Sequence, residues 1–435
     1  MVKGAITAIG NRFQRTDLPL ISPELVLTGD WITVEPDMAQ QSILGFGASF
    51  TDAACYVLSR MDQVSRSRLL HELFHPTQAS LQVCRLCIGA SDYARTAYSY
   101  DDVEDDVELS HFSIDYDRAY IIPVVREALQ VNPDLFLFSS PWSPPGWMKT
   151  GGSMLGGWMR QQYLSVYADY MVRYLQAYRE AGVPIRGITV QNETETDQLG
   201  QMPACYWHPE HEAEFVLHHL APRLEANGLD VLVWILDHNY VMWKRAKWML
   251  DHAPLARVVD GVGFHAYQGK PEMMSMLHDA HPHHHVYWTE GGPDLGQDYL
   301  HNWCHWGKTF TDALRNWSRS ITAWNLALDE RGEPNIGPFP CAGLVTVEED
   351  GKGVLYSGQY AALRHFSSYV KPHAVRVLST EVDGLSNVAF INPDGQKVVV
   401  LTNPKSASRR IGIACAGQRF AVQLEPNSMM TVAWD

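Results

Sequence analysis

The chain has 435 residues, of which 46% are hydrophobic and 19% charged, and its formal net charge is −15. This length and composition exclude a small or disordered domain and allow one large barrel with an accessory domain. The acidic balance argues against nucleic acid and anionic membrane surfaces as partners.

The first 20 residues carry four charges and no long apolar run, so they do not resemble a signal peptide. No apolar run approaches the length of a membrane-spanning helix. The chain contains 7 cysteines at irregular spacing, and the pair Cys84 and Cys87 lies inside an apolar run. We therefore expect reduced core cysteines and a cytoplasmic protein without stable membrane insertion.

Residues 1–42 contain short β-like pieces, such as Leu25–Leu27 and Trp31–Val34, separated by proline and glycine. They are predicted to be edge strands of a small β domain. Residues 369–435 hold six further short strands with turns such as Asn392–Gly395, a pattern typical of antiparallel sheets. We expect both ends of the chain to form one β-sandwich domain beside the barrel.

Residues 43–368 alternate short apolar strands with amphipathic helices. The predicted strands are Ile43–Ser49, Leu81–Ile88, Leu135–Ser139, Gly187–Glu193, Val231–Asp237, Gly261–Tyr267, His285–Glu290 and Ile321–Leu328. The clearest helices are Ser59–Leu73, Tyr116–Gln130, Tyr163–Ala181 and His211–Asn227. Eight such units predict an α/β protein with a (β/α)8 TIM barrel. An open doubly wound sheet is the alternative, weakened because no glycine-rich phosphate loop follows the first strand.

Two of these strands end on a carboxylate. Val286–Trp288 leads to Glu290, and Ile188–Val190 leads to Glu193. On this strand count, Glu193 ends the fourth strand and Glu290 the seventh, so both face the C-terminal rim of the barrel, where active sites form. A pair of carboxylates there suggests glycoside hydrolysis. Glu195 is an alternative to Glu193 as the acid.

Several motifs occur in order along the barrel: Gly45–Asp52 (GFGASFTD), Ser140–Lys149 (SPWSPPGWMK), Gln191–Glu193 (QNE), Trp288–Glu290 (WTE) and Trp324–Leu328 (WNLAL). With them the chain resembles glycoside hydrolase family 30, the glucosylceramidase-like retaining β-glycosidases, from about Gly45 through Ser368. The terminal β module also fits that family. Two departures, Thr194 after the acid and Gly291 and Gly292 after the nucleophile, put the aglycone preference in doubt.

The resemblance implies a role for each matching residue. Glu193 would be the acid/base and Glu290 the nucleophile, with Asn192 bound to the sugar 2-hydroxyl. Arg85 would keep the nucleophile ionised. The remaining matches surround the nucleophile or grip the terminal sugar: His265, Tyr267, Asp92, Trp142 and Trp324.

We expect an exo-acting β-glucosidase that cleaves a β-linked glycoside or oligosaccharide without metal or cofactor. Alternatives within the family are an endo-β-1,6-glucanase, a β-xylosidase and a β-fucosidase. From other classes, an inactive carbohydrate-binding barrel and a metal-dependent hydrolase remain, the latter needing ligands at several strand ends where His265 alone stands out. The histidines of 278–285 and the acidic run 101–108 are predicted to be solvated loops. The oligomeric state is left open.

Overall fold

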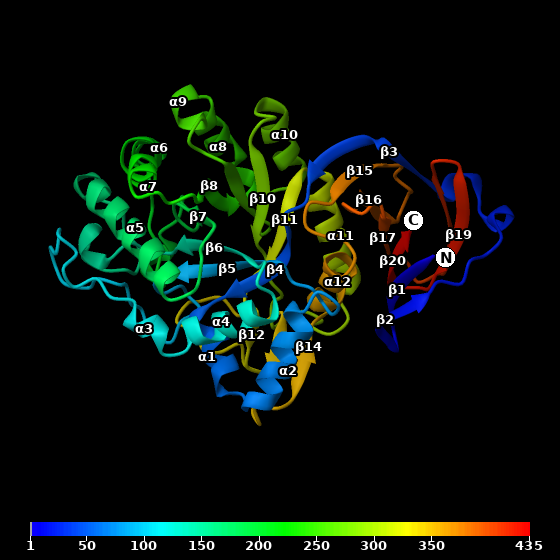
Figure 1. Ribbon diagram of the computed structural model, residues 1–435, viewed down its shortest axis with the longest axis horizontal. Coiled ribbons are helices and arrows are strands. Elements are labelled where there is room, and N and C mark those ends of the chain that lie inside the picture. Colours follow the sequence, from blue (N-terminus) through cyan, green and yellow to red (C-terminus); the bar gives the residue numbers. More distant parts are fainter. Residues whose placement is uncertain (1) are drawn as a thin grey trace.

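The computed structural model describes residues 2–435. Its centre is a closed barrel of eight parallel strands in which β11 returns to pair with β4 (Figure 1). The strands are β4 (Gly45–Phe50), β5 (Val83–Ile88), β6 (Phe136–Pro141), β7 (Gly187–Thr189), β8 (Leu232–Asn239), β9 (Gly261–His265), β10 (His285–Glu290) and β11 (Ser318–Ala323). The predicted TIM barrel is confirmed, and the open doubly wound sheet is excluded.

Helices connect successive strands and cover the outside of the barrel (Figure 1). They are α1 (Asp52–Arg60), α2 (Gln63–Phe74), α3 (Asp115–Arg118), α4 (Ile121–Val131), α5 (Leu164–Glu180), α6 (Pro209–Glu214), α7 (Ala221–Ala226), α8 (Trp243–Leu250), α9 (Ala253–Ala256), α10 (Glu272–Ala280), α11 (Trp303–Arg315) and α12 (Gly358–Ser367). A π-helical turn, Phe215–Leu220, joins α6 to α7. Among residues 2–435, no helix combines the length and apolarity needed to cross a bilayer.

The predicted helix Ser59–Leu73 is wrong at its start. Helix α1 ends at Arg60, and Asp62 caps a new helix, α2, because its carboxylate accepts the backbone N–H groups of Val64 and Ser65 at 3.0 Å. An aspartate at this position satisfies donors that a helix start leaves open.

The inside of the barrel is layered. Val83, Phe138, Trp234 and Tyr287 form a buried apolar layer, in which the Trp234 and Tyr287 rings stack with centroids 4.0 Å apart. Side chains two positions further along a strand point to the same face. The next layer toward the strand ends is therefore polar, and the site is built on it.

Both ends of the chain contribute to one nine-stranded sheet. Its order is β19-β18-β3-β15-β16-β17-β20-β1-β2. The strands are β1 (Lys3–Ala8), β2 (Asn11–Asp17), β3 (Trp31–Ser42), β15 (Val375–Ser379), β16 (Ser386–Ile391), β17 (Lys397–Asn403), β18 (Arg409–Cys415), β19 (Gln418–Leu424) and β20 (Ser428–Trp434). A separate small sheet holds β12 (Ala327–Leu328), β13 (Val345–Val347) and β14 (Val354–Tyr356).

The sheet curls into the predicted sandwich. Phe420 on β19 meets Trp434 on β20 edge to face, with ring centroids 5.2 Å apart, although six places separate the two strands in the sheet order. The prediction that the N-terminal strands are edge strands is wrong for two of the three. β1 lies between β20 and β2, and β3 lies between β18 and β15. β1 is buried on both faces along most of its length, and β3 places Ile32 and Val34 in the core of the β domain.

The β domain packs against α11 and α12 of the barrel (Figure 1). Gly307 of α11 permits the close approach, since a Cβ there would lie 2.6 Å from Oγ1 of Thr402. From α12, the buried imidazole of His365 contacts Thr431 on β20 at 2.9 Å and Thr7 on β1 at 2.8 Å. One histidine therefore ties the barrel to strands from both ends of the chain.

Candidate active site

A pocket of about 640 Å³ opens at the end of the barrel where β10 finishes. Seven of the residues predicted from the sequence line it: Asp92, Trp142, Asn192, Glu193, Tyr267, Glu290 and Trp324. Arg85 and His265 are fully buried behind its wall and contact the carboxylates from there. The fold thus brings all nine predicted residues together.

Glu290 is the last residue of β10 and is 6% exposed. The Tyr267 hydroxyl donates to its Oε1 at 3.0 Å, and the Arg85 guanidinium pairs with its Oε2. His265 Nδ1 lies 3.8 Å from Oε1. Tyr267 and Arg85 thus hold one oxygen each of the Glu290 carboxylate, and His265 lies close to Oε1.

Glu193 lies four residues beyond β7, which ends at Thr189 and is shorter than predicted. Its backbone is in the left-handed region with φ +54°, and its N–H donates to the carbonyl of Asp237 at 2.9 Å. Gln198 Nε2 donates to its Oε2 at 2.7 Å. The chain therefore leaves the sheet before Glu193, and Gln198 of the adjoining loop binds the Glu193 carboxyl group.

Glu195 also lines the pocket but is bound on its other side. Its Oε1 accepts from Nη1 of Arg245 at 3.1 Å, and Arg245 pairs with the buried Glu212 at 2.7 Å. Glu193 instead shares His265 with Glu290, so the geometry favours Glu193 as the partner of that carboxylate.

Asp237 is the central residue that the sequence analysis missed. It is fully buried and accepts hydrogen bonds from Arg85, Ser140 and Thr189 at Oδ2, each at 2.7–2.8 Å. At Oδ1 it accepts from Thr289 at 2.7 Å and lies 3.0 Å from His265 Nε2. Burial alone raises the pKa of Asp237, but the Arg85 charge and these hydrogen bonds bring it well below its usual range.

A bulge in β8 explains why Asp237 faces inward. From Trp234, a regular strand would turn Leu236 into the barrel and Asp237 out. Leu236 and Asp237 instead have φ values of +71° and +47°, and the pairing with β9 shifts register between Leu236 and His238. Bulges of this kind redirect side chains next to active sites. The missed signal was a third strand-end carboxylate, at the end of the predicted strand Val231–Asp237.

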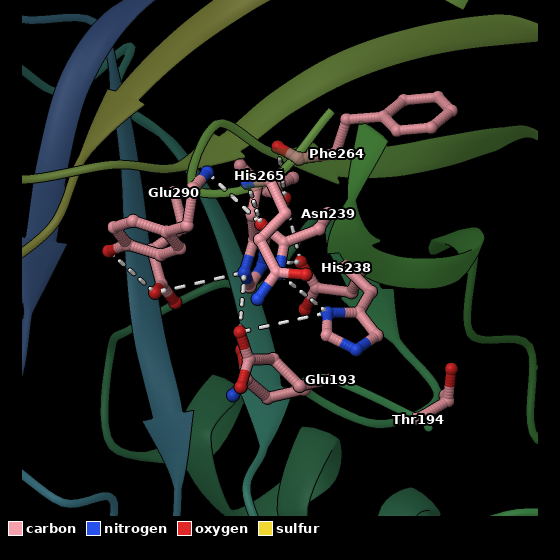
Figure 2. A network of polar contacts seen from close by, with 12 residues as sticks. Glu193, Thr194, His238, Asn239, Phe264, His265 and Glu290 are labelled. Carbon is pink, nitrogen blue, oxygen red and sulfur yellow. Dashed lines mark hydrogen bonds and ion pairs between the residues drawn. The ribbon is translucent and has the colours of Figure 1, made fainter. Parts of the chain in front are cut away.

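His265 lies between Glu193 and Glu290 (Figure 2), and Asp237 contacts it as a third carboxylate. Its Nε2 faces Asp237, and its Nδ1 lies 3.4 Å from Oε1 of Glu193. Burial alone lowers the pKa of His265, but the charge of Glu290 and the contacts with Asp237 and Glu193 raise it to about 10. The imidazole is therefore a cation at neutral pH, with both nitrogens protonated.

Aromatic and polar side chains form one wall of the pocket. Trp142 and Trp324 stack with centroids 5.0 Å apart, and the Arg85 guanidinium lies 4.6 Å from the Trp142 ring. Asn192 is held by Arg85 Nη2, which donates to its Oδ1 at 2.8 Å. This bond fixes which end of the amide faces the pocket, so Asn192 can present its NH₂ group there.

Asp92 also lines this pocket. It is 4% exposed, and its Oδ1 has no hydrogen-bond partner among residues 2–435. Gly337 packs directly on it, since a Cβ there would lie 2.5 Å from the Asp92 Cβ. Burial, and then the charges of Glu290 and Glu193, raise its pKa well above the usual value. A buried carboxyl group without a partner is suited to binding sugar hydroxyls.

Glu193, His238 and His265 each place a donor atom within 4.8 Å of the others, a spacing that a metal ion would need. Their chemistry does not fit one. A protonated imidazole has no lone pair for a metal, and Nε2 of His265 already faces Asp237. No other group of three such ligands occurs in the part of the chain described, 2–435. The donor set disfavours a metal-dependent hydrolase.

The fold and the site together define a class: a barrel enzyme with paired carboxylates at the strand ends, as in glycoside hydrolases. Two family models match the chain, the glycosyl hydrolase family 30 TIM-barrel domain over residues 43–370 and the family's beta sandwich domain over 373–432. The chain belongs to glycoside hydrolase family 30.

Known relatives fall into two groups by name. The chain is 32% identical to an endo-1,6-beta-D-glucanase of Neurospora crassa over 85% of this chain and 80% of that protein. It is 27% identical to the lysosomal acid glucosylceramidase of Mus musculus over 94% and 84%. Among solved structures, the endo-beta1,6-glucanase BT3312 superposes with a TM-score of 0.92 at 27% identity, covering 100% of this chain and 99% of that one.

Proposed function

We propose that this glycoside hydrolase is a retaining, exo-acting β-glucosidase. The observation that carries the retaining mechanism is the shared contact with His265. Its Nδ1 lies 3.4 Å from Oε1 of Glu193 and 3.8 Å from Oε1 of Glu290, so these oxygens are no more than about 7 Å apart. This upper limit includes the separation of about 5–5.5 Å in retaining enzymes and lies below most of the range of about 6.5–9.5 Å in inverting enzymes, which leave room for a water molecule.

In the proposed reaction, Glu290 attacks the anomeric carbon while Glu193 protonates the leaving oxygen. The bond to the aglycone breaks, and a covalent glycosyl ester forms on Glu290. Glu193 then takes a proton from water, whose oxygen attacks the anomeric carbon and frees Glu290. Asn192 binds the 2-hydroxyl. The reaction as proposed requires only these side chains, the substrate and water.

The burial of Asp92 supports exo action. Gly337 packs against Cβ of Asp92, so a sugar bound to this carboxyl group would have little room to continue as a chain past it. A second candidate, endo-β-1,6-glucanase, is favoured by the names of the Neurospora relative and of BT3312. In both cases the sugar that reacts is a β-linked glucose. β-Xylosidase and β-fucosidase remain alternatives. Their sugars differ from glucose in the substituents that would face Asp92.

Three measurements test the proposal. Proton NMR of a β-glucoside during hydrolysis should show β-glucose as the first product, and α-glucose would overturn retention. A panel of aryl β-glycosides (glucoside, xyloside, fucoside, galactoside) should favour the glucoside, and activity should fall at least about 10⁴-fold in E290Q. On a β-1,6-glucan, glucose alone supports exo action, whereas a ladder of oligosaccharides supports the endo candidate.

A further inference from the structure

A buried ion pair joins helices α6 and α8, which lie on the outside of the barrel (Figure 1). Glu212 of α6 is fully buried, and its Oε2 accepts from Nη2 of Arg245 at 2.7 Å and from Nε at 3.1 Å. Arg245 of α8 is 6% exposed, and neither residue is among those that line the pocket. Replacing a buried ion pair by apolar residues of similar volume is often neutral for stability, so stability alone does not explain this one.

Glu212 also binds the bulge of β8. Its Oε1 accepts the backbone N–H of Leu236 at 3.1 Å, at the residue where the pairing with β9 shifts register. Leu236 and Asp237 both have left-handed backbone conformations, which residues other than glycine keep only where the surroundings hold them. The carbonyl of Asp237 in turn accepts the N–H of Glu193, whose backbone is left-handed as well. The carboxylate of Glu212 is therefore connected through the bulge to the backbone of Glu193.

Arg245 holds the two residues that follow the acid. Its Nη1 donates to Oε1 of Glu195 at 3.1 Å, and its Nη2 donates to the carbonyl of Trp207 at 2.9 Å. The N–H of Trp207 donates to the carbonyl of Thr194 at 2.9 Å. Together with the bulge, these contacts connect the ion pair to each of the residues 193–195.

We propose that Glu212 and Arg245 are positioning residues for the acid/base of the reaction. This inference rests on the proposed function, in which Glu193 is that acid/base. The nucleophile Glu290 is held by other contacts, which come from β5 and from the loop after β9. The ion pair should therefore affect the protonation of the leaving oxygen and the activation of water, and leave the attack of the nucleophile largely unchanged.

The variant E212Q breaks either the contact with the bulge or the contact with Arg245. An amide has one oxygen and one NH₂ group, so one of the two donors, the Leu236 N–H or the guanidinium, loses its acceptor. The carboxylate of Asp237 accepts four hydrogen bonds of its own, so the backbone of the bulge should move more than this side chain. E212Q should therefore shift Glu193, whose N–H is bound to that backbone.

The variant R245K keeps the positive charge beside Glu212. Its single ammonium group cannot replace a planar guanidinium that reaches Glu212, Glu195 and the Trp207 carbonyl together. R245K should loosen the residues after the acid while the bond from Glu212 to Leu236 remains, so its effect should be the smaller one. If E212Q does not fold, R245K still tests the inference.

Leaving-group dependence tests the inference. The leaving group of a 2,4-dinitrophenyl β-glucoside departs without protonation, whereas that of a phenyl β-glucoside needs the acid. We expect E212Q and R245K to lower kcat/KM for the phenyl substrate about 10–100-fold, the effect of a misplacement near 1 Å, and to leave the dinitrophenyl substrate nearly unchanged. D117N, which alters a buried carboxylate away from the pocket, should keep the wild-type ratio of the two substrates. Equal losses on both substrates in E212Q and R245K would overturn the inference.

A double variant separates positioning from a general structural role. In E193Q no acid remains to be positioned, so E193Q/E212Q should hydrolyse the phenyl substrate as fast as E193Q does. Losses that multiply in the double variant would mean that Glu212 supports the site in another way, and the inference would fail. Urea unfolding of each variant verifies that the compared proteins are folded.

Failure of this inference is distinguishable from failure of the proposed function. If E193Q shows no selective loss on the phenyl substrate, Glu193 is not the acid and the function assignment itself fails. If E193Q shows the loss and neither E212Q nor R245K does, only the positioning role is wrong. If the wild type cleaves neither glucoside, exo action fails, and the same comparison is made with the two aryl glycosides of a β-1,6-linked glucose disaccharide.

Discussion

At the residue scale, the site contains a buried acid with one free carboxyl oxygen. Asp92 Oδ1 has no partner among residues 2–435, and its raised pKa reflects the cost of ionising a buried carboxyl group near two others. Asp117 is equally buried but accepts hydrogen bonds from three phenols, Tyr98, Tyr100 and Tyr178, at 2.5–2.7 Å. The two aspartates form a matched pair for testing whether Asp92 binds ligand rather than supports the fold.

We expect D92N to raise the free energy of unfolding at pH 7 by about 1–2 kcal/mol, because an amide has no charge to bury. The same change should lower kcat/KM about 10–100-fold through the loss of a hydroxyl contact. D117N should destabilise instead, because its NH₂ group would oppose phenol donors. Urea unfolding and steady-state kinetics measure both. A destabilised D92N would show that Asp92 supports the fold rather than the substrate.

Individual residues also mark what could be predicted from the sequence. Glu193 and Glu290 were found because each follows an apolar run that ends in a polar segment, a local pattern. Asp237 follows a similar run, but its inward direction depends on the bulge at Leu236, which reverses the alternation of the strand. The motif resemblance supplied Arg85, whereas its contacts with Asn192 and Asp237 depend on barrel closure and could not be predicted from spacing.

At the scale of elements, one lysine joins the loops that follow β6 and β7. Lys149 is fully buried, and its Nζ donates to Ser143 Oγ, Met154 O and Ala204 O at 2.7–2.8 Å. All three acceptors are neutral, and burial lowers the pKa of Lys149 to about 8. These loops also carry Trp142 and Met202 of the pocket wall. Lys149 therefore stabilises the loops that shape the pocket.

K149M should lower the free energy of unfolding by about 2–4 kcal/mol, because three buried acceptors lose their donor. It should also raise KM. The stability of the wild type should depend on pH. Above about pH 8 the unfolded chain, in which lysine has a pKa near 10.4, binds more protons than the folded chain. The contribution of Lys149 to the free energy of unfolding therefore rises from about pH 8 to 10.4. Denaturant titrations across that window should show the slope in wild type and not in K149M.

Helices show why boundaries were less predictable than the elements themselves. The apolar period across residues 59–73 continues through the break at Met61, and the capping contacts of Asp62 mark where one helix stops and the next starts. The strands of the barrel were placed well because each is a short apolar run between polar loops. Exact ends depend on caps and tertiary pairing, which periodicity does not encode.

At the scale of the whole molecule, the barrel and the β domain share a buried polar joint. His365 contacts Thr431 and Thr7 through its two nitrogens, and burial lowers its pKa to about 3. A neutral imidazole fits there, because one nitrogen accepts while the other donates. A charged one would have to be buried without a carboxylate at either contact.

The contact between the barrel and the β domain should therefore become less stable in acid. An unfolded histidine has a pKa near 6.5, so between pH 6.5 and 3 the unfolded chain binds the extra proton and stability falls as pH falls. H365Q, which can still contact both threonines, should flatten this decline in calorimetry between pH 6.5 and 4. The exposed His301, beside Asp298, provides the control variant H301Q, which should keep the wild-type slope. An unchanged slope in H365Q would place the acid sensitivity elsewhere.

The strand order of the β domain also affects how the chain can fold during translation. β1 pairs with β20, with Lys3 opposite Ala433, so one of the first strands to leave the ribosome must wait for one of the last. At about 5–20 residues per second, that delay is tens of seconds. During it, the barrel strands emerge in order and each can pair with a neighbour already made, while the buried face of β1 stays uncovered. β1 can pair at once with β2, but its edge that faces β20 stays free while the barrel is made, a period in which chaperone capture would matter most.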